Sequence, residues 1–162
     1  MAAGISVRVY TGADANTESS AVSGIDLMSA DGATNSLANR VANPIVAGQK
    51  SYEKWLKLYI DSAPDNQVDN QKIYSDSSVE ASTHLYWGTT ATGVTPTSAD
   101  SAVATNDATS YTSGAQFTWD TNSLTGVGSK SGFYLVIQLD IDADAAAGNW
   151  TQETLTYSYD EC

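Results

Sequence analysis

Hydrophobic and polar residues alternate most clearly in residues 132–142, GFYLVIQLDID. The apolar residues on alternate positions are Phe133, Leu135, Ile137, Leu139 and Ile141. This period of two is that of a β-strand with one buried face. The intervening positions are apolar at the start of the stretch and polar at its end, so one end is apolar on both faces. We therefore predict that residues 132–142 form a central strand of a packed sheet.

Weaker alternation predicts further strands, separated by turn-forming residues. Their ranges are 5–10, 24–30, 51–61, 68–75, 83–88, 116–120 and 153–160. Residues 51–60 also permit a helix, but the turn-rich sequence around Pro64 fits the end of a strand. The chain is therefore predicted to be all-β, with seven to nine strands in an antiparallel β-sandwich of Ig-like or jelly-roll type.

The N-terminal part of the chain is more loosely patterned than the remainder. Residues 11–24 are predicted to be a polar linker, and residues 89–114 the longest loop, of a length usually functional or disordered in compact domains. We divide the chain into an N-terminal strand or arm, residues 1–42, and a β-sandwich domain, residues 43–162. Two interpretations of the first part stay open: an arm that lies on a neighbouring subunit, or an irregular edge of the same sandwich.

Composition mainly restricts the partners of the chain. The net charge of −12 argues against nucleic acid, which needs a basic face, and against an anionic membrane surface. Solubility explains this acidity, and a cationic partner surface is the alternative explanation. No export signal and no membrane-spanning apolar run is visible. Cys162 is the single cysteine, so we expect no disulfide within the chain.

Asp140, Asp142 and Asp144 form the most suggestive polar cluster and are weak candidates for metal ligands. In a strand these three share one face at spacings of roughly 6–7 Å, too far apart for one cation unless the chain turns. An EF-hand loop would require Gly and Glu where Ala145 and Thr151 stand. We therefore expect a solvated strand end, with no metal and no cofactor.

No set of residues indicates an enzyme. The single histidine, His84, has no nucleophile motif beside it, and we expect it to face solvent or an interface. A zinc site would lack nitrogen and sulfur ligands. Nothing in the sequence distinguishes two of the nineteen carboxylates as a glycosidase pair.

Tyrosine and tryptophan are more numerous than the predicted core requires, with nine Tyr and four Trp against two Phe. Exposed aromatic rings mark protein interfaces or sugar-stacking platforms, and a core built from Tyr and Trp is the alternative. Trp55, Lys57 and Tyr59 share an aromatic and charged face of the strand at residues 51–61, where we predict an interface. The first strand supplies the other predicted interface residues: Ile5, Val7 and Val9.

Four stretches carry a resemblance to known proteins: residues 43–45, 51–76, 132–148 and 153–161. Together they resemble small β-sandwich proteins found among the head and neck components of tailed double-stranded DNA viruses such as bacteriophages. The resemblance implies a capsid decoration (head auxiliary) protein, which is a non-enzymatic structural protein of the virion. It assigns no role to any single residue.

The same resemblance implies a partner and a location. The partner would be the major capsid protein, bound at the capsid surface after assembly in the host cytoplasm. A small homo-oligomer is also implied, for which a trimer is one candidate. The alternatives are a neck or tail structural protein, or a carbohydrate-binding module whose stacking platforms come from its tryptophans: Trp55, Trp87, Trp119 or Trp150.

Overall fold

The computed structural model describes residues 3–32, 35–75, 79–146 and 153–162. Within these residues it has nine strands, all paired antiparallel, in two sheets. The strands are β1 Gly4–Thr11, β2 Thr17–Val22, β3 Lys54–Ser62, β4 Val68–Ser75, β5 Thr83–Thr90, β6 Asn106–Asp107, β7 Phe117–Asp120, β8 Tyr134–Ile141 and β9 Leu155–Glu161. The predicted all-β antiparallel sandwich is confirmed.

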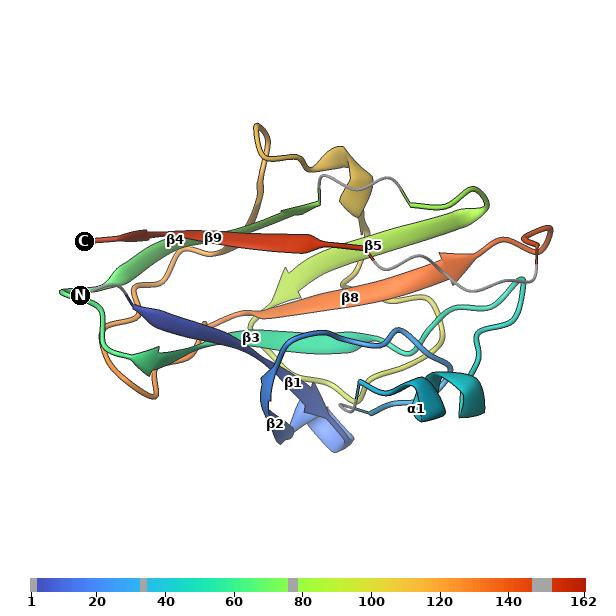
Figure 1. The fold of residues 1–162 in the computed structure, drawn as a ribbon, viewed down its shortest axis with the longest axis horizontal. Helices are drawn as coiled ribbons and strands as arrows, with labels where there is room; N and C mark the ends of the chain where they lie inside the picture. The colour runs from blue at the N-terminus through green and yellow to red at the C-terminus, as the bar shows by residue number, and fades with distance from the viewer. Residues whose placement is uncertain (1–2, 33–34, 76–78, 147–152) are drawn as a thin grey trace.

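The larger sheet has the order β2-β1-β3-β8-β5-β6, and the smaller one β7-β4-β9 (Figure 1). β8 lies between β3 and β5, so the prediction of a central strand is confirmed. Its alternate residues Leu135, Ile137 and Leu139 belong to the core between the sheets, where they pack with side chains of both sheets. The other core residues are Val9, Leu56, Leu58, Ile73, Leu85, Trp87, Ala108 and Trp119.

The alternating pattern predicts that Phe133 lies in the core, but in the structure its side chain is exposed. The chain bends before β8 begins at Tyr134. At this bend the Asp120 carboxylate accepts hydrogen bonds from the backbone N–H groups of Gly132 and Phe133. These bonds hold Phe133 outside the strand, and its backbone carbonyl accepts a hydrogen bond from the Trp119 indole at 3.2 Å.

The first strand is an interior strand of the larger sheet. β1 pairs with β3 from Gly4 to Tyr10 and with β2 on its other side, and Val9 is buried in the core. The predicted boundary at residue 42 therefore cuts through one sheet. Residues 17–22 form β2, whereas the sequence predicted a linker there. The strand escapes prediction because it lies at the sheet edge and its mostly polar side chains show no alternation.

Residues 24–30 do not form the predicted strand. Instead this segment covers the core without pairing into a sheet, with Met28 buried and Ile25 and Leu27 packed against core residues. One short α-helix follows, α1 Leu37–Ala42, and the described residues also contain two 3₁₀ turns, η1 Ala13–Ala15 and η2 Ala108–Ser110.

Part of the predicted long loop covers the outer face of the larger sheet. Residues 91–105 lie over Trp55 and Val136, which are completely buried. The Gln138 side-chain amide holds this segment by donating to the Ala99 carbonyl at 2.8 Å and accepting from the Ser101 N–H at 3.0 Å. The loop thus forms a second layer on the sheet, and its backbone groups make hydrogen bonds to the buried side chains of Glu53 and Gln138.

Candidate functional site

Three cations and three tyrosines meet on the outer face of the larger sheet, the face that points away from the smaller sheet. Cross-strand pairing places Arg8 beside Lys57 on this face, while Val7 and Val9 pair with Leu58 and Leu56 and point inward. We call the group the cation–tyrosine face; its members are Arg8, Lys57, Lys130, Tyr10, Tyr59 and Tyr134. It contains three of the seven Lys and Arg residues of the chain.

Each cation of the face stands over an aromatic ring. The Arg8 guanidinium carbon lies 3.4 Å from the centroid of the Tyr59 ring, and the Lys57 ammonium lies 4.2 Å from that of Tyr134. The Lys130 ammonium is 5.9 Å from the Tyr10 and Tyr59 centroids. Such cation–π contacts hold the charges at fixed positions above the sheet.

Glu18 of β2 is the carboxylate that organises this face. It accepts hydrogen bonds from Arg8 at 2.8 Å and from the Tyr10 hydroxyl at 2.7 Å, and it is also paired with Lys130. Burial alone would raise the pKa of Glu18, but hydrogen bonds from Lys130, Tyr10 and Arg8 outweigh this effect and lower it to about 2. Glu18 is therefore ionised at every physiological pH.

The face is close to electrically neutral, in a chain whose net charge is −12. Its three cations meet three carboxylates: Glu18, Asp61, which lies 3.5 Å from Arg8, and Asp120, which acts on Lys57. Burial lowers the pKa of Lys57, and Asp120 is the strongest of the charges that oppose this shift. The arrangement can accept an anionic group beside aromatic surface.

Sequence reasoning found two residues of this face, Lys57 and Tyr59, both half-buried. The prediction that Trp55 belongs to an interface is wrong, because Trp55 is completely buried beneath residues 91–105. Its indole donates a hydrogen bond to the Glu53 carboxylate at 3.0 Å. The predicted interface role of Val9 is also wrong, because Val9 packs in the core. Ile5 and Val7 are half-buried and also pack against the core, and their interface role stays a prediction.

Arg8, Glu18 and Lys130 were missed because they come from three separate segments. Arg8 stands in a predicted strand, but no local pattern relates it to Glu18 in the supposed linker or to Lys130 in a turn. Only the hairpin of β1 with β2 brings Glu18 across from Tyr10. The signal in the sequence that could have revealed these residues is the scarcity of cations, because a chain with only seven Lys and Arg residues makes the position of each one informative.

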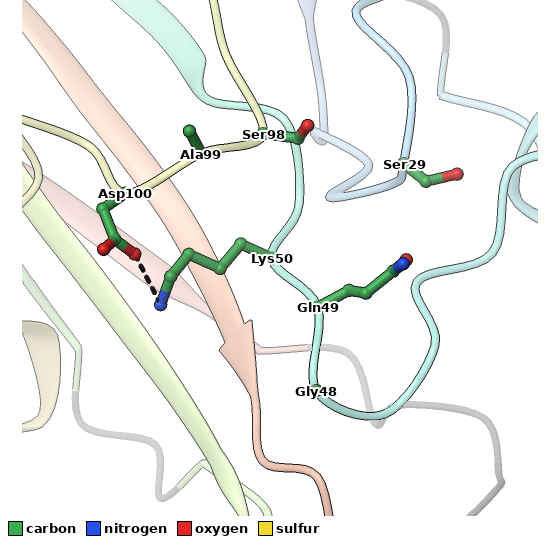
Figure 2. Close-up of a pocket in the computed structure, with 7 residues that line it drawn as sticks. All are labelled: Ser29, Gly48, Gln49, Lys50, Ser98, Ala99 and Asp100. Atoms are coloured by element: carbon green, nitrogen blue, oxygen red, sulfur yellow. Dashed lines mark ion pairs between the residues drawn. The ribbon is translucent and has the colours of Figure 1, made fainter.

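A shallow pocket lies elsewhere, at the entrance to β3, with a volume of about 380 Å³. It is lined by Ser29, Gly48, Gln49, Lys50, Ser98, Ala99 and Asp100. Figure 2 shows the Lys50 side chain reaching toward Asp100, while Gln49 and Ser29 lie on the other side. A second hollow of about 270 Å³ adjoins the same Lys50–Asp100 pair.

Lys50 is held as a cation in this pocket. Its ammonium lies 3.3 Å from Asp100 and is also paired with Asp140. Burial would lower the pKa of Lys50, but its hydrogen bonds to Asp140 and Asp100 reverse the effect, and the pKa is raised. A lysine in this state is neither a base nor a nucleophile near neutral pH.

A second lysine, Lys54, is almost completely buried. Its ammonium donates to the Gly32 carbonyl at 2.5 Å. Burial lowers the pKa of Lys54, and Asp31 and Asp26 partly oppose this shift. Lys54 lines neither of the two hollows, so a substrate held in them does not reach its ammonium.

The three aspartates of the predicted weak metal site have separate surroundings. Asp140 pairs with Lys50, and Asp142 lies 3.2 Å from the His84 imidazole. Asp144 stands exposed in a turn. Within the described residues, no group of three or more His, Cys, Asp or Glu side chains is arranged to hold a metal ion.

Three of the four tryptophans named as sugar platforms belong to the interior of the protein. Trp55, Trp87 and Trp119 are buried, so none of the three presents a ring to a sugar. The fourth, Trp150, lies outside the described residues.

Comparison with known proteins identifies no relative. No family model, no curated protein and no solved structure matches the chain. In the part of the chain that the structure describes, no helix has the length and apolar character needed to cross a membrane.

Proposed function

We propose that this chain is a non-enzymatic structural protein of a virion, a capsid decoration protein that binds the major capsid protein of a tailed virus. The proposal starts from the resemblance of residues 43–45, 51–76, 132–148 and 153–161 to such proteins. An all-β sandwich is consistent with it. Its place is the capsid surface, where the chain stabilises the head lattice.

The cation–tyrosine face is the observation that carries the proposal. An acidic protein that binds a large assembly needs one surface where its own charge does not repel the partner. This face combines three cations with tyrosine rings, and Tyr and Arg are enriched where proteins meet. The matching partner surface presents carboxylates beside apolar side chains.

The charged groups of the pocket at Lys50 support a role without chemistry. The lysine is paired with two aspartates, and the remaining lining comes from small or neutral side chains. A general base or nucleophile needs a group whose pKa is brought toward neutrality, whereas that of Lys50 is raised away from it.

Charge reversal at Lys130 tests the proposal. Lys130 is the most exposed cation of the face, and it is held there by Glu18. We expect Lys130→Glu to weaken binding by about tenfold or more, a change of about 1.4 kcal/mol. The measurement is cosedimentation of the purified chain with capsids that lack it, at several salt concentrations. Wild-type binding should weaken as salt rises, because salt screens exposed charge pairs.

Lys72→Glu is the matched control, because it makes the same charge change on β4 of the smaller sheet. Thermal unfolding of both variants must first show that each is folded. Equal binding by Lys130→Glu and the wild type would show that the cation–tyrosine face is not the contact. Failure of the wild type to cosediment would contradict the proposed function itself.

A further inference from the structure

The helix α1 presents its apolar residues to solvent. Leu37 and Val41 are one turn apart on the same side, and they are 69% and 72% exposed. Val46, five residues further on, is 51% exposed. These three side chains, called the α1 patch below, are half of the six large hydrophobic side chains exposed in the described residues.

Polar contacts hold the helix in place. The Arg40 guanidinium lies 2.7 Å from the carboxylate of Asp26, which is nearly buried, and the same carboxylate accepts from the Ser36 N–H at 2.8 Å. Ser36 caps the helix through the Asn39 N–H. Six residues do not form a stable helix in water by themselves, so these contacts fix an orientation that leaves the apolar side chains outside. Figure 1 shows α1 lying outside both sheets. Two large apolar side chains held side by side outside the fold, as Leu37 and Val41 are, indicate an interaction surface.

The charge of the surrounding sequence indicates what covers the patch. Residues 32–52 contain no Asp or Glu and two cations, Arg40 and Lys50, whereas the rest of the chain has nineteen carboxylates against five cations. Two copies of this chain therefore repel each other over most of their surface and least at this segment. Arg40 is paired with Asp26, and Lys50 with Asp100 and Asp140, so this segment carries little net charge and offers a basic partner no carboxylate of its own.

Carboxylates from a neighbouring segment lie at the margin of this surface. The Gly48 N–H donates to the carbonyls of Ile141 and Asp142, which brings residues 141–144 beside the end of the patch. The Asp142 carboxylate is directed to His84 at 3.2 Å, and Asp144 is exposed. Carboxylates therefore lie at the margin of the surface, as is usual for an interface, and the one charged residue of the helix, Arg40, is paired with Asp26.

We propose that the α1 patch is the surface through which two copies of this chain associate about a twofold axis. An apolar ridge made by Leu37 and Val41 is self-complementary, and a twofold contact uses the same patch on both subunits. The inference rests on the resemblance behind the proposed function, which implies a small homo-oligomer, and it names the surface through which that oligomer forms. Because three side chains cover little area, the dimer is weak and forms at high local concentration, as on a lattice.

Sedimentation velocity of the isolated chain over a range of concentrations tests this proposal without capsids. The wild type should be a reversible dimer, and salt should strengthen it, because screening reduces repulsion between acidic subunits. The variant Leu37→Glu/Val41→Lys should be monomeric, with a dissociation constant raised by about tenfold or more. This pair keeps the net charge and adds a helix-stabilising ion pair at i and i+4, so the fold is preserved.

Val94→Glu/Val127→Lys is the matched control, since it changes two exposed valines outside the patch in the same way. It should dimerise like the wild type. A wild type that stays monomeric at every concentration up to its solubility limit, a trimer, a dimer that salt weakens, or a dimer unaffected by the patch variant would each overturn the proposal. If the wild type is monomeric and the patch variant no longer binds capsids, the α1 patch contacts the capsid protein instead of a second copy of this chain. Failure of capsid binding with an intact, patch-dependent dimer would contradict the proposed function and leave this inference standing.

Discussion

Glu18 illustrates how a single residue determines the character of a surface. Its carboxylate joins a strand residue, Arg8, to a turn residue, Lys130, and it also accepts from the buried Tyr10 hydroxyl. Without Glu18 the three cations of the face would repel one another. Hydrogen bonding to the ionised form of Glu18 contributes to the stability of the fold and depends on pH.

The pH dependence of stability can be predicted for this residue. The pKa of Glu18 falls from its ordinary value of 4.5 to about 2 in the folded chain. A lowered pKa stabilises the fold above pH 4.5, and this stabilisation is lost as the pH falls from 4.5 toward 2. In Glu18→Gln the free energy of unfolding should decrease less steeply over this range, as measured by urea unfolding at several pH values.

Asp14→Asn is a suitable control because Asp14 is exposed and has a positive φ of 56°, a backbone conformation that Asn tolerates. It should follow the wild-type pH dependence. Identical pH dependence in Glu18→Gln and the wild type would mean that the hydrogen bonds to Glu18 do not lower its pKa.

At the scale of elements, the contact of β5 with residues 91–105 depends on the absence of a side chain. A Cβ at Gly88 would lie 1.9 Å from the Val103 carbonyl oxygen, a backbone atom that cannot move aside alone. Glycine at this position lets the segment approach the sheet and cover Trp55 and Val136. A sequence rich in Thr, Ser and Ala thus becomes an ordered layer.

Substituting Gly88 should open this layer. We expect Gly88→Ala to lower the free energy of unfolding by about 1–3 kcal/mol, because the backbone must shift to accept the methyl group. Limited proteolysis within residues 91–105 should become faster. Gly126→Ala is the matched control, since a Cβ there meets no atom within 4 Å. Equal proteolysis of the two variants would contradict the described packing.

At the scale of the whole molecule, the two ends of the chain belong to one structure. The backbone N–H of Ala3 donates to the Glu161 carboxylate at 3.0 Å, and Figure 1 shows both ends on the same side of the molecule. The Tyr157 hydroxyl donates to the Ile5 carbonyl at 3.2 Å, which joins β9 of the smaller sheet to β1 of the larger one. The N-terminal strand is therefore part of the sandwich.

Removal of residues 1–23 should consequently prevent folding. It deletes β1 and β2, leaves one edge of β3 without its hydrogen-bonded partner, and removes Val9 from the core. Circular dichroism during heating should show no cooperative transition. The milder variant Val9→Ala should cost about 2 kcal/mol, while Val94→Ala, at an exposed site, should cost little. A truncated chain that unfolds cooperatively would restore the interpretation of an N-terminal arm.

The sequence by itself determined the fold class and most strands. Residues 68–75 coincide with β4, and the predicted strands at 51–61, 83–88, 116–120 and 132–142 each overlap a strand of the structure. This succeeded because a strand with one buried face must alternate, and the alternation is a local property of the chain. The prediction failed where burial is not alternating, as in β2 and in residues 24–30.

Only the tertiary structure decided which aromatic and charged residues are accessible. Trp55 and Tyr59 share one face of β3, yet the first is covered by residues 91–105 and the second lies beside Arg8 at the surface. Alternation assigns a residue to a face, but it does not say which other segment covers that face. The cation–tyrosine face and the α1 patch depend on such long-range contacts, and local patterning therefore left both undetermined.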